Sequence, residues 1–114
     1  MYTYEVVIFP DQVHDGDTIT KVVVDLGFHI TCKTSIRLKG VWAKELNSKI
    51  EADALLAIKQ RDYLIDLILE YGADFILKSE RLDKYGRCEG VLISSKLGSV
   101  YTINDLLNKQ FQKE

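Results

Sequence analysis

The sequence has few residues that could tie a fold together by covalent bonds or a tightly held metal. It contains two cysteines, Cys32 and Cys88, which lie far apart and form no CxxC pair, and two histidines, His14 and His29, with no paired ligand nearby. This pattern favours neither a disulfide scaffold, which has several cysteines, nor a zinc site, which has Cys and His ligands at close spacing. We expect the cysteines to be small buried hydrophobic residues and the histidines to be ordinary strand-edge residues.

The sequence also lacks a long apolar run, and it has only one proline. No stretch approaches the roughly 18 apolar residues that predict a membrane helix. An apolar fraction of 46% argues against disorder. The first residues, MYTYEVVIFPD, lack the basic start and the cleavage site of a secretory leader. We therefore expect a cytoplasmic protein with no membrane contact, and secretion stays open if a leader precedes this sequence.

Neither sign of charge dominates the chain. The 15 basic and 17 acidic residues give a net charge of −2, which does not by itself predict nucleic-acid binding. The positive charge is concentrated, however, since residues 33–44 hold four basic and no acidic side chains, and residues 78–87 hold four basic and two acidic ones. Each segment is either a solvated face or part of a binding surface.

Five segments are typical of β-strands because they are rich in β-branched and aromatic residues. They are residues 4–9, 18–26, 28–39, 74–80 and 88–94.

The third of these segments alternates between apolar and polar residues. Its even positions are predicted to face the core, and they are Phe28, Ile30, Cys32, Thr34, Ile36 and Leu38. Period-two alternation then puts Arg37 on the opposite face, beside Lys33 and Lys39.

One long helix is predicted near residues 49–71. Ser48 followed by Glu51 has the spacing of a capping box, and Gly72 supplies a C-cap. Apolar residues recur between them at helical spacing and predict an inner face made of Ile50, Ala54, Leu55, Ile58, Ile65, Ile68 and Leu69.

The order of elements predicts the fold class. A short helix is expected near residues 103–110, and its predicted inner face is Ile103, Leu106, Leu107 and Phe111. Three strands, a helix, two strands and this short helix match a five-stranded Greek-key barrel of the OB type. We therefore predict one α+β domain over residues 1–114, mainly β, with one long helix after the third strand and a short C-terminal helix. One fold hosts many functions, so the order alone does not predict an activity.

The segment VHDGDTI, residues 13–19, has two interpretations. Asp-Gly is a strong hairpin signal, because glycine adopts a positive φ at little cost. The two carboxylates of Asp15 and Asp17 are also the kind of ligand that a hard cation prefers. The segment taken alone leaves both interpretations open.

Three short segments together resemble the thermonuclease family, the staphylococcal nuclease-like fold. They are VHDGDTI, IRLKGVWAKE at the end of the third strand, and DKYGR between the last two strands. The family carries a DGDT turn, an RL-x-G-(I/V)-(D/N)-(A/T)-P-E segment and a D-x-Y-G-R turn in the same order. Asn104 and Leu107 look like its N-x-x-L element, so the similarity extends over residues 6–108.

The resemblance implies calcium-dependent hydrolysis of phosphodiester bonds in DNA or RNA, by an endonuclease or exonuclease. It implies that Asp17 is the principal calcium ligand, with Asp15 as an outer aspartate and Ala43 as a ligand through its backbone carbonyl. Calcium prefers such oxygen ligands, and a bound divalent cation can neutralise developing negative charge and orient water.

The resemblance also implies catalytic and substrate-binding residues. Arg37 and Arg87 match the two arginines that grip the phosphate, a task suited to the planar guanidinium group. Glu45 matches the residue that positions or deprotonates the attacking water. Lys84 and Tyr85 match residues that hold the neighbouring phosphate of the substrate.

Two residues depart from the family pattern, because its (D/N)-(A/T)-P-E appears here as Trp42-Ala43-Lys44-Glu45. Trp42 takes the position of the second oxygen ligand, and an indole offers only an N–H donor, so we expect weak calcium binding. Lys44 replaces the proline, which loosens the loop and adds positive charge. Trp42 either contacts the substrate by stacking on a base at the mouth of the cleft or fills core volume.

Two functions therefore stay open. The first is a nuclease with weakened calcium binding, favoured because Asp17, Arg37, Glu45 and Arg87 are all present. The second is a catalytically degenerate nuclease-like OB module that binds nucleic acid or a protein partner. We also expect the family's further C-terminal segment to be absent. The preference for DNA or RNA and the oligomeric state are not predicted.

Overall fold

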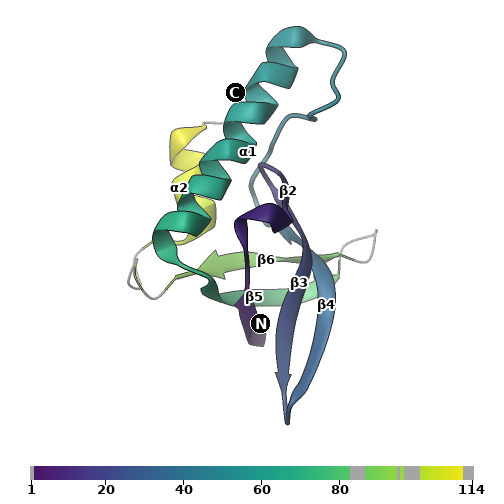
Figure 1. The fold of residues 1–114 in the computed structure, drawn as a ribbon, viewed down its shortest axis with the longest axis vertical. Coiled ribbons are helices and arrows are strands. Elements are labelled where there is room, and N and C mark those ends of the chain that lie inside the picture. The colour runs from purple at the N-terminus through teal and green to yellow at the C-terminus, as the bar shows by residue number, and fades with distance from the viewer. Residues whose placement is uncertain (1, 83–86, 95, 97–100, 112–114) are drawn as a thin grey trace.

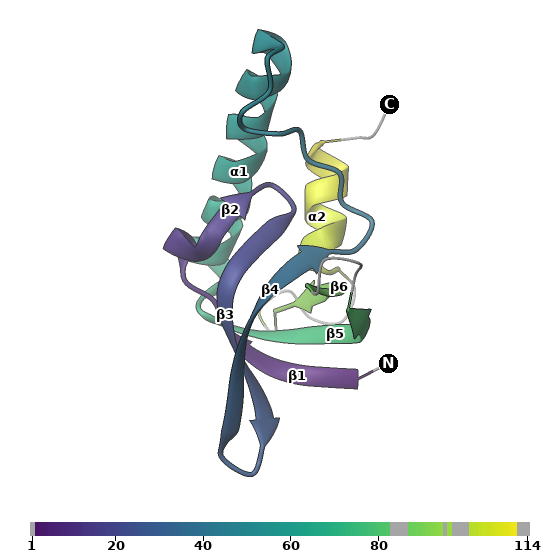
Figure 2. The same ribbon diagram turned by 90° about the vertical axis from the view of Figure 1, so that its right-hand side faces the viewer.

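A computed structural model of the chain describes residues 2–82, 87–94, 96 and 101–111. In these residues, six strands and two α-helices follow one another in the order β1 to β4, α1, β5, β6 and α2, with a short 3₁₀-helix, η1 (Pro10–Gln12), after β1. Both α-helices lie at one end of the sheet, and the hairpin of β3 and β4 extends from the other end (Figures 1 and 2).

Five of the strands close into a mixed barrel. Their order is β1 (Tyr2–Val7), β5 (Asp74–Leu82), β6 (Cys88–Ile93), β4 (Ile30–Leu38) and β3 (Thr18–Gly27), and β3 pairs again with β1. Among the strand pairs of the described residues, only β4 with β6 is parallel. This is the strand order of an OB-like barrel, so the predicted α+β class and the five-stranded barrel are confirmed. An extra short strand, β2 (Val13–Asp15), pairs with β3 and was not predicted.

The core lies between the barrel and the two helices. Alternate residues of the strands point inward, and they are joined by residues of α1 and α2; the fully buried side chains include Ile19, Ile36, Leu38, Leu77, Leu92, Leu64 and Ile103. Arg37 lies between two of them on β4, so its predicted place on the outer face is confirmed.

The β3–β4 hairpin is longer than the barrel, which corrects the predicted orientation of its first residues. Phe28, Ile30 and Cys32 were expected in the core, yet all three are exposed, Phe28 to 95%. The reason is that β6 reaches only Ile36–Leu38 of β4, so nothing in the described structure covers the far end of the hairpin. Phe28 and His29 form its turn, both at positive φ.

The long helix is confirmed as α1 (Glu51–Tyr71), two residues after its predicted start, but the predicted capping box of Ser48 and Glu51 is wrong. Ile50 is the N-cap residue and makes no side-chain capping bond, while the Ser48 hydroxyl accepts a hydrogen bond from the Ile50 N–H at 3.2 Å. Gly72 ends the helix at a φ of 87°, a conformation that favours glycine.

The predicted inner face of α1 is also wrong, except at Ile68. The buried residues are Ala57, Gln60, Leu64, Leu67 and Ile68, whereas Leu55, Ile58 and Leu69 are exposed. Because α1 is apolar on two sides, the helical period predicts the helix without selecting the side that contacts the barrel.

The short helix α2 (Ile103–Gln110) is confirmed together with its inner face, since Ile103 and Leu107 are buried. Thr102 caps it by accepting a hydrogen bond from the Asp105 N–H, and the Asp105 carboxylate accepts one from the Thr102 N–H. Within the described part of the chain, no helix is long and apolar enough to cross a membrane.

Asn104 ties α2 to the barrel. Its side chain is 4% exposed. Its Oδ1 accepts a hydrogen bond from the Leu92 N–H at 3.0 Å, and its Nδ2 donates to the carbonyls of Lys39 and Gly90 at 2.8 and 3.2 Å. One side chain thus joins β6 to the residue that follows β4, and these two strands run in parallel.

Candidate functional site

The DGD segment forms a tight turn between β2 and β3. Asp15 pairs with Thr18, which leaves Gly16 and Asp17 as the turn residues. Gly16 is not among the described glycines at positive φ, so the turn does not use that property of glycine. Glycine is needed here for space, since a Cβ at Gly16 would lie 2.7 Å from the Cβ of Gln60. The turn therefore lies directly against α1.

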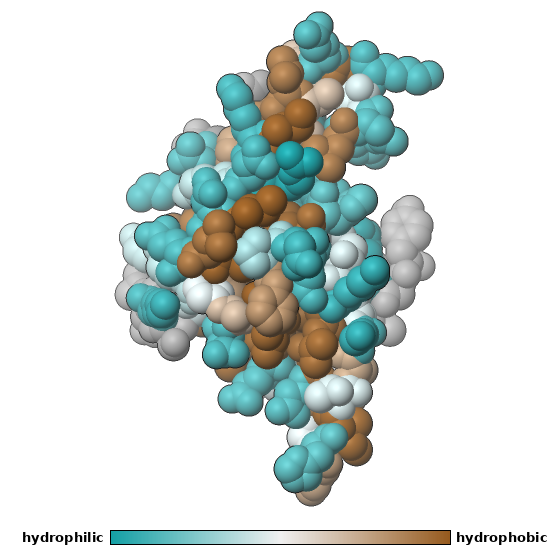
Figure 3. Space-filling view, in the orientation of Figure 1, coloured by the Kyte–Doolittle hydropathy of each residue, from teal (hydrophilic) through white to brown (hydrophobic). Residues whose placement is uncertain are grey.

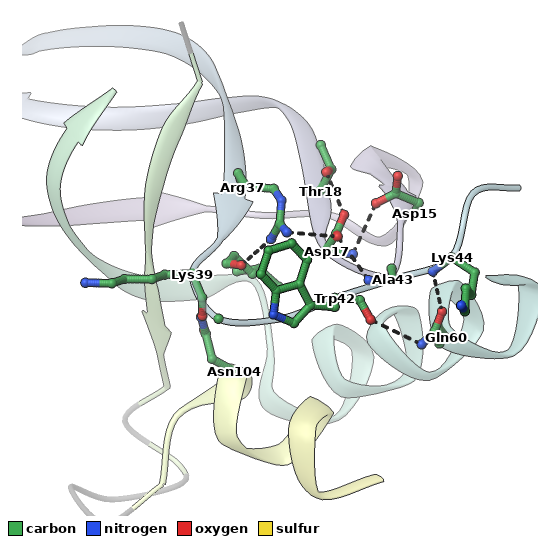
Figure 4. A network of polar contacts seen from close by, with 12 residues as sticks. Asp15, Asp17, Thr18, Arg37, Lys39, Trp42, Ala43, Lys44, Gln60 and Asn104 are labelled. Carbon is green, nitrogen blue, oxygen red and sulfur yellow. Dashed lines mark hydrogen bonds and ion pairs between the residues drawn. The ribbon is translucent and has the colours of Figure 1, made fainter. Parts of the chain in front are cut away.

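The Asp17 carboxylate lies at the centre of a polar network, although its residue is only 8% exposed. Its Oδ1 accepts a hydrogen bond from the Thr18 hydroxyl at 2.9 Å. Its Oδ2 accepts one from the Ala43 N–H at 3.1 Å and lies 3.3 Å from Nη2 of Arg37. The Asp15 carboxylate turns back and accepts a hydrogen bond from the Asp17 N–H at 3.1 Å (Figure 4). The structure thus brings Asp15, Asp17, Arg37 and Ala43 together.

Arg37 lies between this carboxylate and the indole of Trp42. Its guanidinium carbon is 5.4 Å from the centroid of the Trp42 ring, and Nη1 donates to the Leu38 carbonyl. Trp42 itself is 60% exposed, so it does not fill core volume, one of the two alternatives for it. The other alternative, stacking on a base, stays a prediction. The ring presents an aromatic surface at the mouth of the site, over a cation.

Gln60 holds the loop that carries Trp42, a role that sequence reasoning missed. It is buried on α1, its Oε1 accepts a hydrogen bond from the Lys44 N–H at 2.9 Å, and its Nε2 donates to the Trp42 carbonyl at 3.4 Å (Figure 4). Both contacts flank Ala43, so the amide fixes the backbone beside Asp17. The signal that could have found it is a polar residue within the buried stripe of a helix.

The remaining predicted residues lie on other segments of the chain. Glu45 is exposed in the loop before α1, and within the described structure its carboxylate makes no hydrogen bond or ion pair. Arg87 is half-buried and directly precedes β6, where Cys88 pairs with Ile36. Alternation along the paired strands therefore places Arg87 on the same face as Arg37. Lys84 and Tyr85 lie outside the described residues.

The pKa of Asp17 is raised from 3.8 to about 6. The largest cause is burial, which disfavours the charged form, and the neighbouring Asp15 adds to the rise. The guanidinium of Arg37 and the Ala43 N–H act in the opposite direction, because both stabilise the carboxylate. At neutral pH Asp17 is thus ionised at some cost to the stability of the fold.

We expect this cost to appear as a pH-dependent stability. Folded Asp17 keeps its proton up to a pKa of about 6 instead of 3.8, so between these values the unfolded state binds fewer protons. The free energy of unfolding then falls as pH rises, by roughly 3 kcal/mol for a shift of about two units. Urea unfolding in a chelator should measure the free energy of unfolding of Asp17→Asn relative to wild type at about pH 4 and about pH 7. We expect this difference to be more favourable to the variant at about pH 7, where wild-type Asp17 is ionised. A difference that is the same at both pH values would contradict this.

The donor set fits a hard cation in kind but offers few ligands. The carboxylates of Asp15 and Asp17 and the carbonyl of Ala43 are all oxygen donors, and Trp42 contributes none. Among the described residues, no three His, Cys, Asp or Glu side chains gather as a metal site would need. Calcium takes about six to eight oxygen ligands, so water and substrate would have to supply most of them.

A hollow elsewhere on the barrel has a different character. Its volume is about 610 Å³, and it is lined by Glu5, Asp25 and Asp74 together with Thr31 and apolar residues of β1, β3, β5 and β6. Three carboxylates repel a phosphate, so this hollow does not compete with the Asp17 site for nucleic acid.

No protein-family model and no curated protein matches the chain in sequence.

Proposed function

We propose that the protein is a metal-assisted phosphodiesterase that acts on nucleic acid and holds calcium weakly. The observation that carries the proposal is the contact of Asp17 with Arg37 beneath an exposed Trp42, at the end of an OB-like barrel. The resemblance of the same residues to thermonuclease motifs supports it.

Arg37 is arranged to bind a phosphate oxygen. A guanidinium has five N–H donors, and the contacts to Asp17 and Leu38 hold it by only part of them. The remaining donors are available to a planar, bidentate partner such as a phosphate. Arg87, on the same face, supplies a second positive charge for the same group.

Asp15, Asp17 and the Ala43 carbonyl would hold the cation. When bound, calcium would neutralise charge that develops on the phosphate and orient water. Glu45 accepts the proton of the attacking water in this proposal, and its exposed loop position leaves its carboxylate without a competing cation in the described structure.

A second candidate is a binding module without catalysis. It is favoured by Trp42, which presents an indole where the family has an oxygen ligand. It is also favoured by Lys44, which stands where the family has a proline and whose ammonium lies 3.9 Å from the Asp53 carboxylate. Aromatic stacking on bases and basic side chains near them suffice to bind a single strand.

One experiment separates the two candidates. Labelled single-stranded DNA is mixed with the intact chain, and binding is followed in a chelator while cleavage is followed with calcium. A phosphodiesterase binds and cleaves, and Glu45→Gln should slow cleavage tenfold or more with binding unchanged. Binding without calcium-dependent cleavage would establish the module instead. The absence of both binding and cleavage would contradict both candidates.

Calcium affinity is a separate expected result. With two carboxylates and a backbone carbonyl at the site, we expect millimolar affinity by calorimetry, because ligand charge and number set calcium affinity. Asp17→Asn should weaken it further. The matched control is Asp62→Asn on α1, an exposed aspartate outside the network, which should leave it unchanged. Micromolar affinity in the wild type would contradict this prediction.

A further inference from the structure

The outward face of α1 is an apolar surface that the described part of the chain leaves uncovered. We define it as Ala54, Leu55, Ile58, Ile65 and Leu69. Leu55, Ile58 and Leu69 are 55%, 39% and 65% exposed. Figure 3 shows apolar side chains at the surface where α1 and the loop before it lie. Contiguous exposed apolar surface of this kind marks an interaction site more often than isolated exposed residues do.

The spacing of this outward face is that of a helix–helix seam. Leu55, Ile58, Asp62, Ile65 and Leu69 follow one another at alternating steps of three and four residues, the a and d positions of a heptad. They lie almost opposite the buried stripe of Ala57, Gln60, Leu64, Leu67 and Ile68. The helix thus carries one stripe for its own barrel and another for a second helix.

The charges beside the outward face are self-complementary in an antiparallel pair. If two copies of α1 meet with a twofold axis at Asp62, Leu55 lies opposite Leu69 of the other copy, and Lys59 lies within one residue of Asp66, on the same side of the seam. The two Asp62 carboxylates face each other at the axis, and each keeps a positive neighbour, because it lies 3.1 Å from Arg61. The first turn of α1 extends away from the barrel (Figure 1), so the antiparallel pair also places the two barrels at opposite ends.

We propose that the outward face of α1 binds the same face of a second copy as an antiparallel helix pair. The pair is weak. α1 has 21 residues and is about 31 Å long, so one helix face buries much less than the about 800 Å² per partner of a stable interface. Association therefore depends on concentration, and it is independent of what the Asp17 site binds.

Sedimentation equilibrium of the intact chain from micromolar to millimolar concentration measures this association. We expect a monomer at the low end and a dimer at the high end, and Leu55→Lys should weaken the dimer about tenfold or more, since it puts a charge into the seam. The matched control is Phe28→Lys at the hairpin tip, which is more exposed and should have no effect. Circular dichroism at low concentration should show both variants folded.

A charge exchange tests the antiparallel arrangement. Lys59→Glu alone and Asp66→Lys alone should each weaken the dimer, and the double variant should restore it, because each new glutamate then meets a new lysine of the other copy. A monomer at all concentrations would overturn the proposal, as would a dimer insensitive to Leu55→Lys. A double variant that stays as weak as the single ones would overturn the antiparallel pairing.

Discussion

Replacing Asn104 with leucine is expected to lower the free energy of unfolding by about 3 kcal/mol or more. The change removes three hydrogen bonds from one buried side chain and leaves the Leu92 N–H and the carbonyls of Lys39 and Gly90 without that partner. Each buried polar group that loses its partner costs about 1–3 kcal/mol. Urea unfolding followed by circular dichroism measures the change.

Asn108→Leu is the matched control, because it is the same substitution one turn later on the same helix. Asn108 is exposed and makes one hydrogen bond, from Nδ2 to the Gly40 carbonyl at 3.1 Å. Its loss should cost about 1 kcal/mol or less. Equal costs for the two variants would show that Asn104 does not join the strand ends in the way described.

Replacing Arg37 with alanine is expected to slow phosphodiester hydrolysis by about 10² or more, because a positioned cation stabilises the charge of the transition state. Binding of single-stranded DNA should weaken as well, since the same guanidinium holds the phosphate. The measurement is the initial rate of cleavage with saturating calcium, at a temperature where urea unfolding shows the variant to be folded.

Arg61→Ala is the control for this prediction. Arg61 is a partly exposed arginine on α1 that pairs with Asp62, away from the Asp17 network. It changes the net charge by the same amount as Arg37→Ala and should leave the cleavage rate as it is. A rate that is equally low in both variants would point to net charge, and an unchanged rate in Arg37→Ala would place the activity elsewhere.

The barrel could be predicted from the sequence because its signals are local. Period-two alternation, β-branched content and the DG turn predict strands and a hairpin with no knowledge of the neighbours. The exposure of Phe28 and Cys32 could not be predicted in the same way. It depends on how far β6 extends along β4, which is a property of the assembled sheet.

The helix shows the same limit in another form. Its period predicted α1 to within two residues at its start, but the side that contacts the barrel was predicted wrongly. Both sides of α1 are apolar, and packing against β2, η1 and α2 selects the stripe with Leu64 and Leu67. The leftover stripe, with Leu55 and Leu69, is therefore the clearest feature that the periodicity alone misassigned.

The residues of the candidate site that belong to sequence motifs could be predicted. The residues that contribute through packing between distant segments could not. The alternation of β4 placed Arg37 outside the core, and the motif order placed it near Asp17. Nothing in the motifs indicates Gln60, which fixes the loop through its amide, or the close approach that requires Gly16. Both act through contacts between segments far apart in sequence.

The most direct test of the proposed site uses Trp42, the only tryptophan in the chain. A deoxynucleoside 3′,5′-bisphosphate is added to the intact protein with calcium, and the indole emission is followed. A phosphate held by Arg37 brings the nucleoside against the exposed ring, so we predict a saturable change in emission that Arg87→Ala abolishes. Emission that stays the same at every nucleotide concentration, in a protein shown to be folded, would contradict a nucleic-acid site at Asp17 and Arg37.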